Sequence, residues 1–175
     1  SILSRLLEPL RKMGRDKECR NILLFGHSRV IVKHLLRLCS EVGAGTAGNQ
    51  VSIVIFGMDE SLSAALEKQC RAQGVKPISP WQVALSRWDL VIVADHSYFE
   101  EIVPNGTPVV FIYHGMGSIT KVSGQNYKYG DLFVRTKSGA LKYDMMFEAG
   151  TFQQSYVERF YPELKEAIEV VGDLE

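Results

Sequence analysis

Short, continuous apolar runs alternate with segments of helical periodicity along almost the whole chain. A run that is apolar throughout suits a strand buried on both faces, which is typical of a parallel sheet covered by helices. The pattern therefore predicts a doubly wound, mostly parallel, Rossmann-like α/β sheet with helices on both faces. The expected strands are 21–25, 51–56, 75–78, 89–94, 107–113, 131–135 and 168–171.

Helix-start residues follow several of these runs. Ser28 and Asp59 are good N-cap residues, and each precedes apolar residues at helical spacing. Pro80 suits the first turn of a short helix that runs toward residue 87. The other expected helices are a brief one at 97–102, one capped by Ser138, and one at 153–167 that is bent near Pro162.

The two ends of the chain depart from this alternation. Residues 1–17 carry apolar residues at helical spacing with basic residues among them, and they predict an amphipathic helix. That helix either lies on an anionic membrane surface or packs on the domain. Residues 18–167 form the Rossmann-like domain, and we expect 168–175 to begin a linker or a truncated second domain. Val170 and Val171 would then be either frayed or paired with the first sheet.

Composition gives no support for a nucleic-acid-binding, membrane-spanning or secreted protein. The 175 residues include twenty basic and twenty acidic side chains, so the net charge gives no indication of nucleic-acid binding. We find neither an apolar run of the ~20 residues that a membrane span needs nor a signal peptide. Three cysteines at unrelated spacings (Cys19, Cys39 and Cys70) suggest reduced thiols in a cytoplasmic protein. The chain contains no CxxC or HExxH spacing, and we expect no metal.

Histidines follow three of the expected strands, where doubly wound sheets bind their ligands. His27 follows the first strand, and Ser28 then starts a helix whose N-terminus favours an anion. His27 could contact a phosphate or hydroxyl there, or it could be an ordinary polar loop residue. His96 follows Asp95, but adjacent side chains at a strand end usually point apart.

His114 is the strongest single candidate. An imidazole has a pKa suited to general-base catalysis without much tuning. Gly115 and Gly117 let a ligand approach the backbone, whose amides could bind phosphate. Ser118 and Lys121 in the same loop are also suited to phosphate. The alternative is a half-buried histidine that is hydrogen-bonded across strand ends.

One glycine pattern matches the dinucleotide-binding motif in its letters but not in its position relative to the strands and helices. Residues 43–48 match GxGxxG, but this stretch follows a helix and precedes a strand, whereas the dinucleotide motif follows a strand and opens a helix. We interpret it as a loop. Asp59 likewise suits an N-cap better than a ribose-binding acid, because no glycine-rich loop follows the first strand.

The order of these features resembles the acceptor half of two-domain GT-B glycosyltransferases. The closest resemblance within them is to the CDP-glycerol glycerophosphotransferase (teichoic-acid polymerase) family. Its Trp-His-Gly-Thr-Pro motif corresponds to Tyr113-His114-Gly115, although Met116-Gly117 replaces Thr-Pro and Lys121 comes later than the family's lysine. Residues 131–138 resemble the family's next strand and Ser-capped helix, and 168–173 resemble the first strand of its nucleotide-binding half.

The resemblance implies the acceptor-side half of a nucleotide-dependent glycosyl- or glycerophosphate-transferase that acts on a cell-envelope polymer or glycan. The donor, CDP-glycerol or a nucleotide sugar, would bind a missing C-terminal domain, so the isolated chain would be inactive. A polyol or glycan would be the acceptor, without a cofactor, in the cytoplasm or at the inner face of the membrane. His114 would be the base, and the substrate-binding residues would be His27, Ser28, Gly115, Gly117, Ser118 and Lys121.

Two other functions remain open from the sequence. One is a non-catalytic Rossmann-like module that binds a phosphorylated ligand. The other is the N-terminal half of a nucleotide-sugar epimerase, a fold relative that also uses histidines at this cleft.

Overall fold

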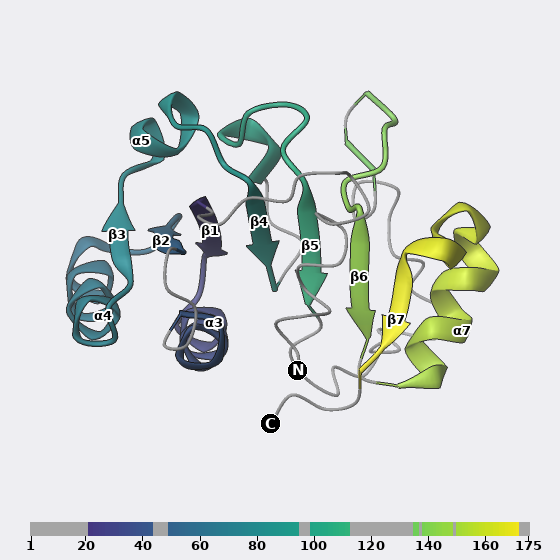
Figure 1. The fold of residues 1–175 in the computed structure, drawn as a ribbon, viewed down its shortest axis with the longest axis horizontal. Helices are drawn as coiled ribbons and strands as arrows, with labels where there is room; N and C mark the ends of the chain where they lie inside the picture. Colours follow the sequence, from purple (N-terminus) through teal and green to yellow (C-terminus); the bar gives the residue numbers. More distant parts are fainter. Residues whose placement is uncertain are drawn as a thin grey trace.

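A seven-stranded, all-parallel sheet organises the chain, with strand order β3-β2-β1-β4-β5-β6-β7 (Figure 1). The computed structural model describes residues 21–43, 49–94, 99–112, 135–136, 138–148 and 150–171. The predicted doubly wound, Rossmann-like fold is confirmed. The strands are β1 Asn21–Gly26, β2 Gln50–Ile55, β3 Lys76–Ile78, β4 Leu90–Val93, β5 Val109–Ile112, β6 Met145–Glu148 and β7 Ile168–Val170.

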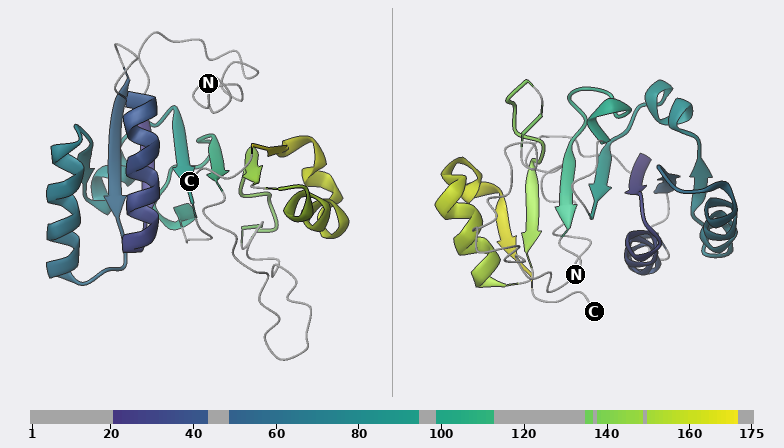
Figure 2. Two further views of the ribbon diagram at one scale, coloured as in Figure 1. Left: turned by 90° about the horizontal axis from the view of Figure 1, so that it is seen from below. Right: turned by 180° about the vertical axis from the view of Figure 1, so that it is seen from behind.

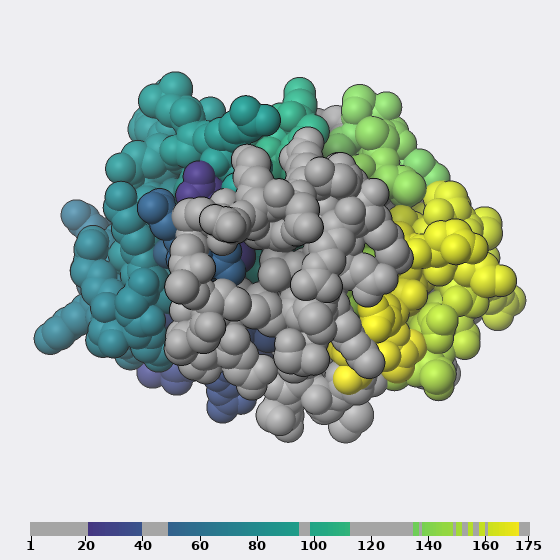
Figure 3. Space-filling view, in the orientation of Figure 1, coloured from purple at the N-terminus to yellow at the C-terminus, as the bar shows by residue number. Residues whose placement is uncertain are grey.

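Helices connect the strands and cover both faces of the sheet. Figure 1 shows α4 beside β3 at one end of the sheet and α7 beside β7 at the other, and the space-filling view in Figure 3 shows the same two ends. Figure 2 shows α3 and α4 lying side by side. The helices are α3 Arg29–Gly43, α4 Glu60–Ala72, α5 Pro80–Leu85, η1 Phe99–Glu101, α7 Thr151–Phe160 and η2 Pro162–Ala167.

Side chains that alternate between the two faces of the sheet form two hydrophobic cores, one on each face. On one face, Leu24 and Ile53 pack in a cluster with Leu35 of α3 and Leu66 of α4. On the other face, the cluster contains Val83 of α5, Phe99 of η1 and Leu164 of η2. Successive residues of a strand point to opposite faces, so runs such as Leu-Val-Ile-Val in β4 supply both cores, and all four of its residues are buried.

Two aspartates accept hydrogen bonds from backbone N–H groups at the edge of the sheet where the strands begin. Asp89 directly precedes β4 and accepts a hydrogen bond from the backbone N–H of Asn21 at 3.0 Å. Asp144 directly precedes β6 and accepts from the N–H of Val109 at 2.7 Å. In both cases the carboxylate satisfies the first backbone donor of the neighbouring parallel strand, which would otherwise lack a ladder partner.

The predicted helix capped by Ser138 is wrong. Arg135 and Leu141 form an antiparallel bridge, and Gly139 turns the chain between them with a φ of 85°. Arg135 also donates to the carbonyl oxygen of Gly139 at 3.0 Å. A positive φ suits glycine and ends any helix at this point. The chain then enters β6, a strand that the sequence did not predict.

Most other local predictions are confirmed. The predicted break near Pro162 separates α7 from η2. Pro80 starts α5 as predicted, and the structure adds a capping box formed by Ser79 and Gln82. Cys39 and Cys70 are buried free thiols on α3 and α4. Of the two alternatives for Val170, frayed or paired with the first sheet, the structure shows the second, because β7 pairs with β6 in register Glu148↔Val170.

Several predictions fall outside the described residues. They concern the amphipathic helix at 1–17, the loop at 44–48, the pair Asp95 and His96, and the strand residues 131–134. Among the residues that are described, no helix is both long and apolar enough to cross a membrane.

Candidate functional site

The topological switch point of the sheet lies between β1 and β4. The chain runs outward from β1 to β2 and β3, and then returns to place β4 on the other side of β1. Doubly wound sheets bind ligands at the carboxyl ends of the strands that flank such a point. The turn from β1 into α3 lies at this position and consists of Gly26, His27 and Ser28.

Gly26 holds α3 close to β1. A Cβ placed on Gly26 would lie 2.6 Å from Cγ2 of Val32 on α3, which is well inside van der Waals contact. The carbonyl oxygen of Gly26 accepts from the N–H of Phe56 at 2.9 Å, which also ties the turn to the end of β2. Glycine suits this position because any larger residue would collide with the Val32 side chain unless α3 or the valine moved.

His27 and Ser28 lie together at the N-terminus of α3, as the sequence predicted. Ser28 Oγ accepts from the N–H of Ile31 at 3.3 Å, so it caps the helix, and its hydroxyl hydrogen can still donate. His27 is half-buried, with Nδ1 shielded from solvent. The first turn of α3 carries no acidic residue to offset the positive end of the helix dipole. This turn therefore favours an anionic group.

Asp59, at the end of β2, serves as an N-cap. Its carboxylate accepts from the N–H of Leu62 at 2.9 Å and from the hydroxyl of Ser61 at 2.7 Å. These two hydrogen bonds lower the pKa of Asp59, and the bond from Leu62 has the larger effect. The predicted role of Asp59 as the N-cap of α4 is confirmed.

Glu148 ends β6 at the same carboxyl edge, and the sequence reasoning missed it. Its side chain is 1% exposed. Neither carboxyl oxygen has a hydrogen-bond partner within the described part of the chain. Burial raises the pKa of Glu148 to about 7, because the charged form loses its hydration. Met145, Met146 and Phe147 form an apolar run that this glutamate ends, and that pattern was the signal available in the sequence.

The remaining predicted site residues lie outside the described residues. β5 ends at Ile112, and His114 follows two positions later in the sequence. Gly115, Gly117, Ser118 and Lys121 belong to the same stretch, 113–134. Their roles stay predictions.

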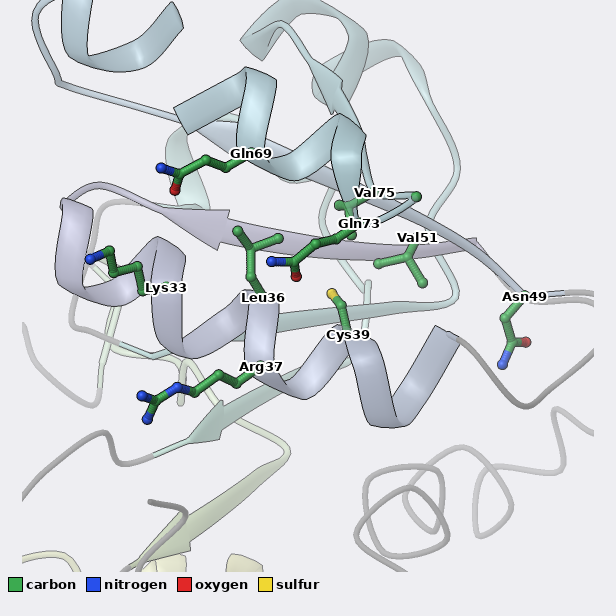
Figure 4. A pocket seen from close by; sticks show the side chains of 10 residues that line it. Lys33, Leu36, Arg37, Cys39, Asn49, Val51, Gln69, Gln73 and Val75 are labelled. Atoms are coloured by element: carbon green, nitrogen blue, oxygen red, sulfur yellow. The ribbon is translucent and has the colours of Figure 1, made fainter. Parts of the chain in front are cut away.

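Two cavities in the described part of the chain lie away from the carboxyl ends of the strands. The first, of about 770 Å³, lies between α3 and α4 (Figure 4). Leu36 and Cys39 of α3 point toward Gln73, which follows α4, while the charged ends of Lys33 and Arg37 point away from Leu36. Burial, with a smaller effect from Cys70, raises the pKa of Cys39 to about 12, so the thiol is not a nucleophile.

The second cavity, of about 740 Å³, lies at the amino edge. It is lined by residues that start strands, such as Asn21 and Gln50, and by Arg87 and Trp88 before β4. Parallel α/β sheets place their chemistry at the opposite edge, so we assign the candidate site to the strand ends rather than to either cavity. Among the described residues, no group of three or more His, Cys, Asp or Glu side chains could hold a metal ion.

Comparisons with protein-family models, with curated proteins and with solved structures found no match to this chain.

Proposed function

We propose that this chain is the acceptor-side half of a nucleotide-dependent glycosyl- or glycerophosphate-transferase. The observation that carries the proposal is the turn at the switch point, where His27 and Ser28 lie at a helix N-terminus that has no acidic residue in its first turn. Such a turn suits the phosphate of a phosphorylated acceptor. The resemblance of Tyr113-His114-Gly115 to the transferase motif adds the base.

In the proposed reaction, His114 takes the proton from an acceptor hydroxyl. The acceptor oxygen attacks the phosphorus of CDP-glycerol or the anomeric carbon of a nucleotide sugar and forms a bond to it. The bond from that atom to the nucleotide breaks, and the nucleotide leaves. His27 and Ser28 hold the acceptor, with the backbone amides of Gly115 and Gly117 and with Ser118 as further donors. Lys121 offsets phosphate charge. The donor would bind a second domain, and CDP-glycerol and nucleotide sugars are both candidates.

Binding measurements on this chain test the acceptor half of the proposal. We expect glycerol 3-phosphate to bind, and CDP-glycerol and UDP-sugars to bind much more weakly, when each is titrated by calorimetry. His27→Ala should weaken glycerol 3-phosphate by ~10-fold or more, as expected for a lost hydrogen bond to a charged group. His34→Gln, a half-buried histidine farther along α3, is the matched control and should leave the affinity unchanged.

Tight binding of a nucleotide to this chain alone would contradict the proposal, because it would place the donor site on this domain. In the enzyme that also carries the donor domain, His114→Ala should lower turnover by ~10²- to 10⁴-fold with binding retained. Binding without any effect of His114→Ala on transfer would favour the second candidate, a non-catalytic module for a phosphorylated ligand. The same helix N-terminus supports that candidate.

A further inference from the structure

The apolar core on one face of the sheet ends where three neighbouring strands begin. On that face the core includes Leu23 of β1 and Val54 of β2, and Ile78 of β3 packs against it. The side chain two positions before each of these residues lies on the same face, because side chains alternate along a strand. Those three earlier residues are all polar: Asn21, Ser52 and Lys76.

A cavity of about 740 Å³ lies at this polar end of the face. Asn21, Ser52 and Lys76 line it from the strands, and Gln82 of α5 and Ser86 directly after α5 line it from the covering segment. Ser52 is 9% exposed and is paired in register with Lys76. The volume falls within the ~300–1,000 Å³ that is usual for a small-molecule site.

The lining of this cavity carries two positive charges and no acidic residue. Lys76 begins β3, and Arg87 precedes β4; neither side chain forms an ion pair with any residue that the structure describes. The buried Asp89 is not among the lining residues, and its carboxylate accepts from the N–H of Asn21. The cavity therefore favours an anion. Two cations from separate segments suit a phosphate, whose charge is about −1.5 to −2 at pH 7.

The neutral part of the lining suits hydroxyl groups better than a nucleotide base. A base binds by stacking on an aromatic face. Trp88 is the aromatic residue of the lining, but it is 7% exposed and its indole N–H donates to the carbonyl oxygen of Val83 at 3.0 Å. Side-chain amides offer both donors and acceptors, which match the hydroxyl groups of a sugar. Four of them line the cavity: Asn21, Asn49, Gln50 and Gln82.

We infer that this cavity is a second binding site and that its ligand is a sugar phosphate. Lys76 and Arg87 bind the phosphate, while Ser52 and the amides bind hydroxyl groups of the sugar. The site lies at the edge of the sheet where the strands begin, whereas the turn that contains His27 lies at the opposite edge. It goes beyond the proposed function and does not depend on it.

The indole N–H of Trp88 provides a signal from this cavity alone. The chain has two tryptophans, and the other, Trp81, is 79% exposed. Trp81→Phe therefore leaves a single indole signal in a ¹H–¹⁵N spectrum, that of Trp88. Glucose 6-phosphate is the probe, and its titration follows the shift of this signal. Glucose, inorganic phosphate and gluconate, which has one carboxylate in place of the phosphate, are the comparison ligands.

We expect glucose 6-phosphate to shift the Trp88 signal saturably and to bind more tightly than each of the three comparison ligands. In the Trp81→Phe background, Lys76→Gln and Arg87→Gln should each weaken it by ~10-fold or more, because each removes a hydrogen bond to a charged group. Lys68→Gln removes the same charge from an exposed position on α4 that does not line the cavity, and it should bind within about 3-fold of the parent.

Three results would overturn the inference. One is the absence of a saturable shift at about 10 mM glucose 6-phosphate. Another is an equal affinity in Lys68→Gln and in either cavity variant, which would indicate general surface charge. The third is an affinity for glucose, phosphate or gluconate that equals that for glucose 6-phosphate. His27→Ala should leave the Trp88 titration unchanged, and loss of the shift in that variant would place the ligand at the other edge and overturn the inference as well.

Discussion

Glu148 should make the stability of the protein depend on pH. Its pKa rises from 4.5 to about 7 on folding because the side chain is buried. The folded state therefore binds the proton more tightly than the unfolded state. The stabilisation that this proton binding gives is fully present below about pH 4.5 and is lost as the pH rises through 7. The shift corresponds to a destabilisation of about 3 kcal/mol above pH 7.

We expect Glu148→Gln to remove this dependence. Urea denaturation at a series of pH values should show that the stability of the wild type falls relative to the variant between pH 4.5 and 7. Taking the difference between the two proteins cancels the titration of all other groups. A difference that stays constant with pH would show that Glu148 titrates alike in the folded and unfolded chains.

At the scale of elements, the turn from β1 into α3 depends on the contact between Gly26 and Val32. Gly26→Ala introduces a methyl group 2.6 Å from Val32 Cγ2, so either the valine or the helix must move. We expect a loss of about 1–3 kcal/mol in unfolding free energy, as is typical of overpacking. Binding of a phosphorylated probe should weaken as well, because His27 follows Gly26 directly.

Val32→Ala supplies the control for this prediction. It removes the atom that the new methyl group would meet, so the double variant Gly26→Ala/Val32→Ala should lose less stability than the sum of the two single variants. Chemical denaturation of the four proteins measures this coupling. Strict additivity would show that close packing of α3 is not the reason for glycine at this position.

At the scale of the whole molecule, β7 forms the end of the sheet beside β6. It pairs over Met146↔Ile168, Phe147↔Glu169 and Glu148↔Val170. A chain that ends at residue 167 would lose this ladder and leave β6 as an exposed edge. At about 1 kcal/mol for each hydrogen bond of the ladder, we expect a loss of a few kcal/mol in unfolding free energy. The loss should be visible in urea denaturation, together with a greater tendency to aggregate.

A chain that ends at Val171 is the matched control, because it keeps the whole ladder described for β7. Its stability should match that of the full chain. In the shorter chain, the Glu148 carboxyl should also gain water, so its pKa should fall toward the ordinary value. Equal stability of all three chains would show that β7 contributes little to the sheet.

The sequence alone determined those parts of the protein that depend on neighbours along the chain. Apolar runs at 21–25, 51–56 and 89–94 predicted buried strands, and Ser28, Asp59 and Pro80 marked helix starts that the structure contains. Capping and burial on both faces are local patterns, because hydrogen bonds at a helix end and the alternation of a strand involve residues a few positions apart. The position of His27 between the first strand and a helix start followed from the same reasoning, whereas the switch point depends on the order of the strands in the sheet.

Only the tertiary structure decided β6, the strand between β5 and β7. Met and Glu are good helix formers, so Met145–Glu148 did not suggest a strand, yet β5 and β7 pair with it on both sides. Ser138 was expected to cap a helix, but the turn at Gly139 returns the chain toward β6. The burial of Glu148 likewise depends on the strands and helices that cover it. These features arise from contacts between residues far apart in the chain, where long-range pairing overrides local propensity.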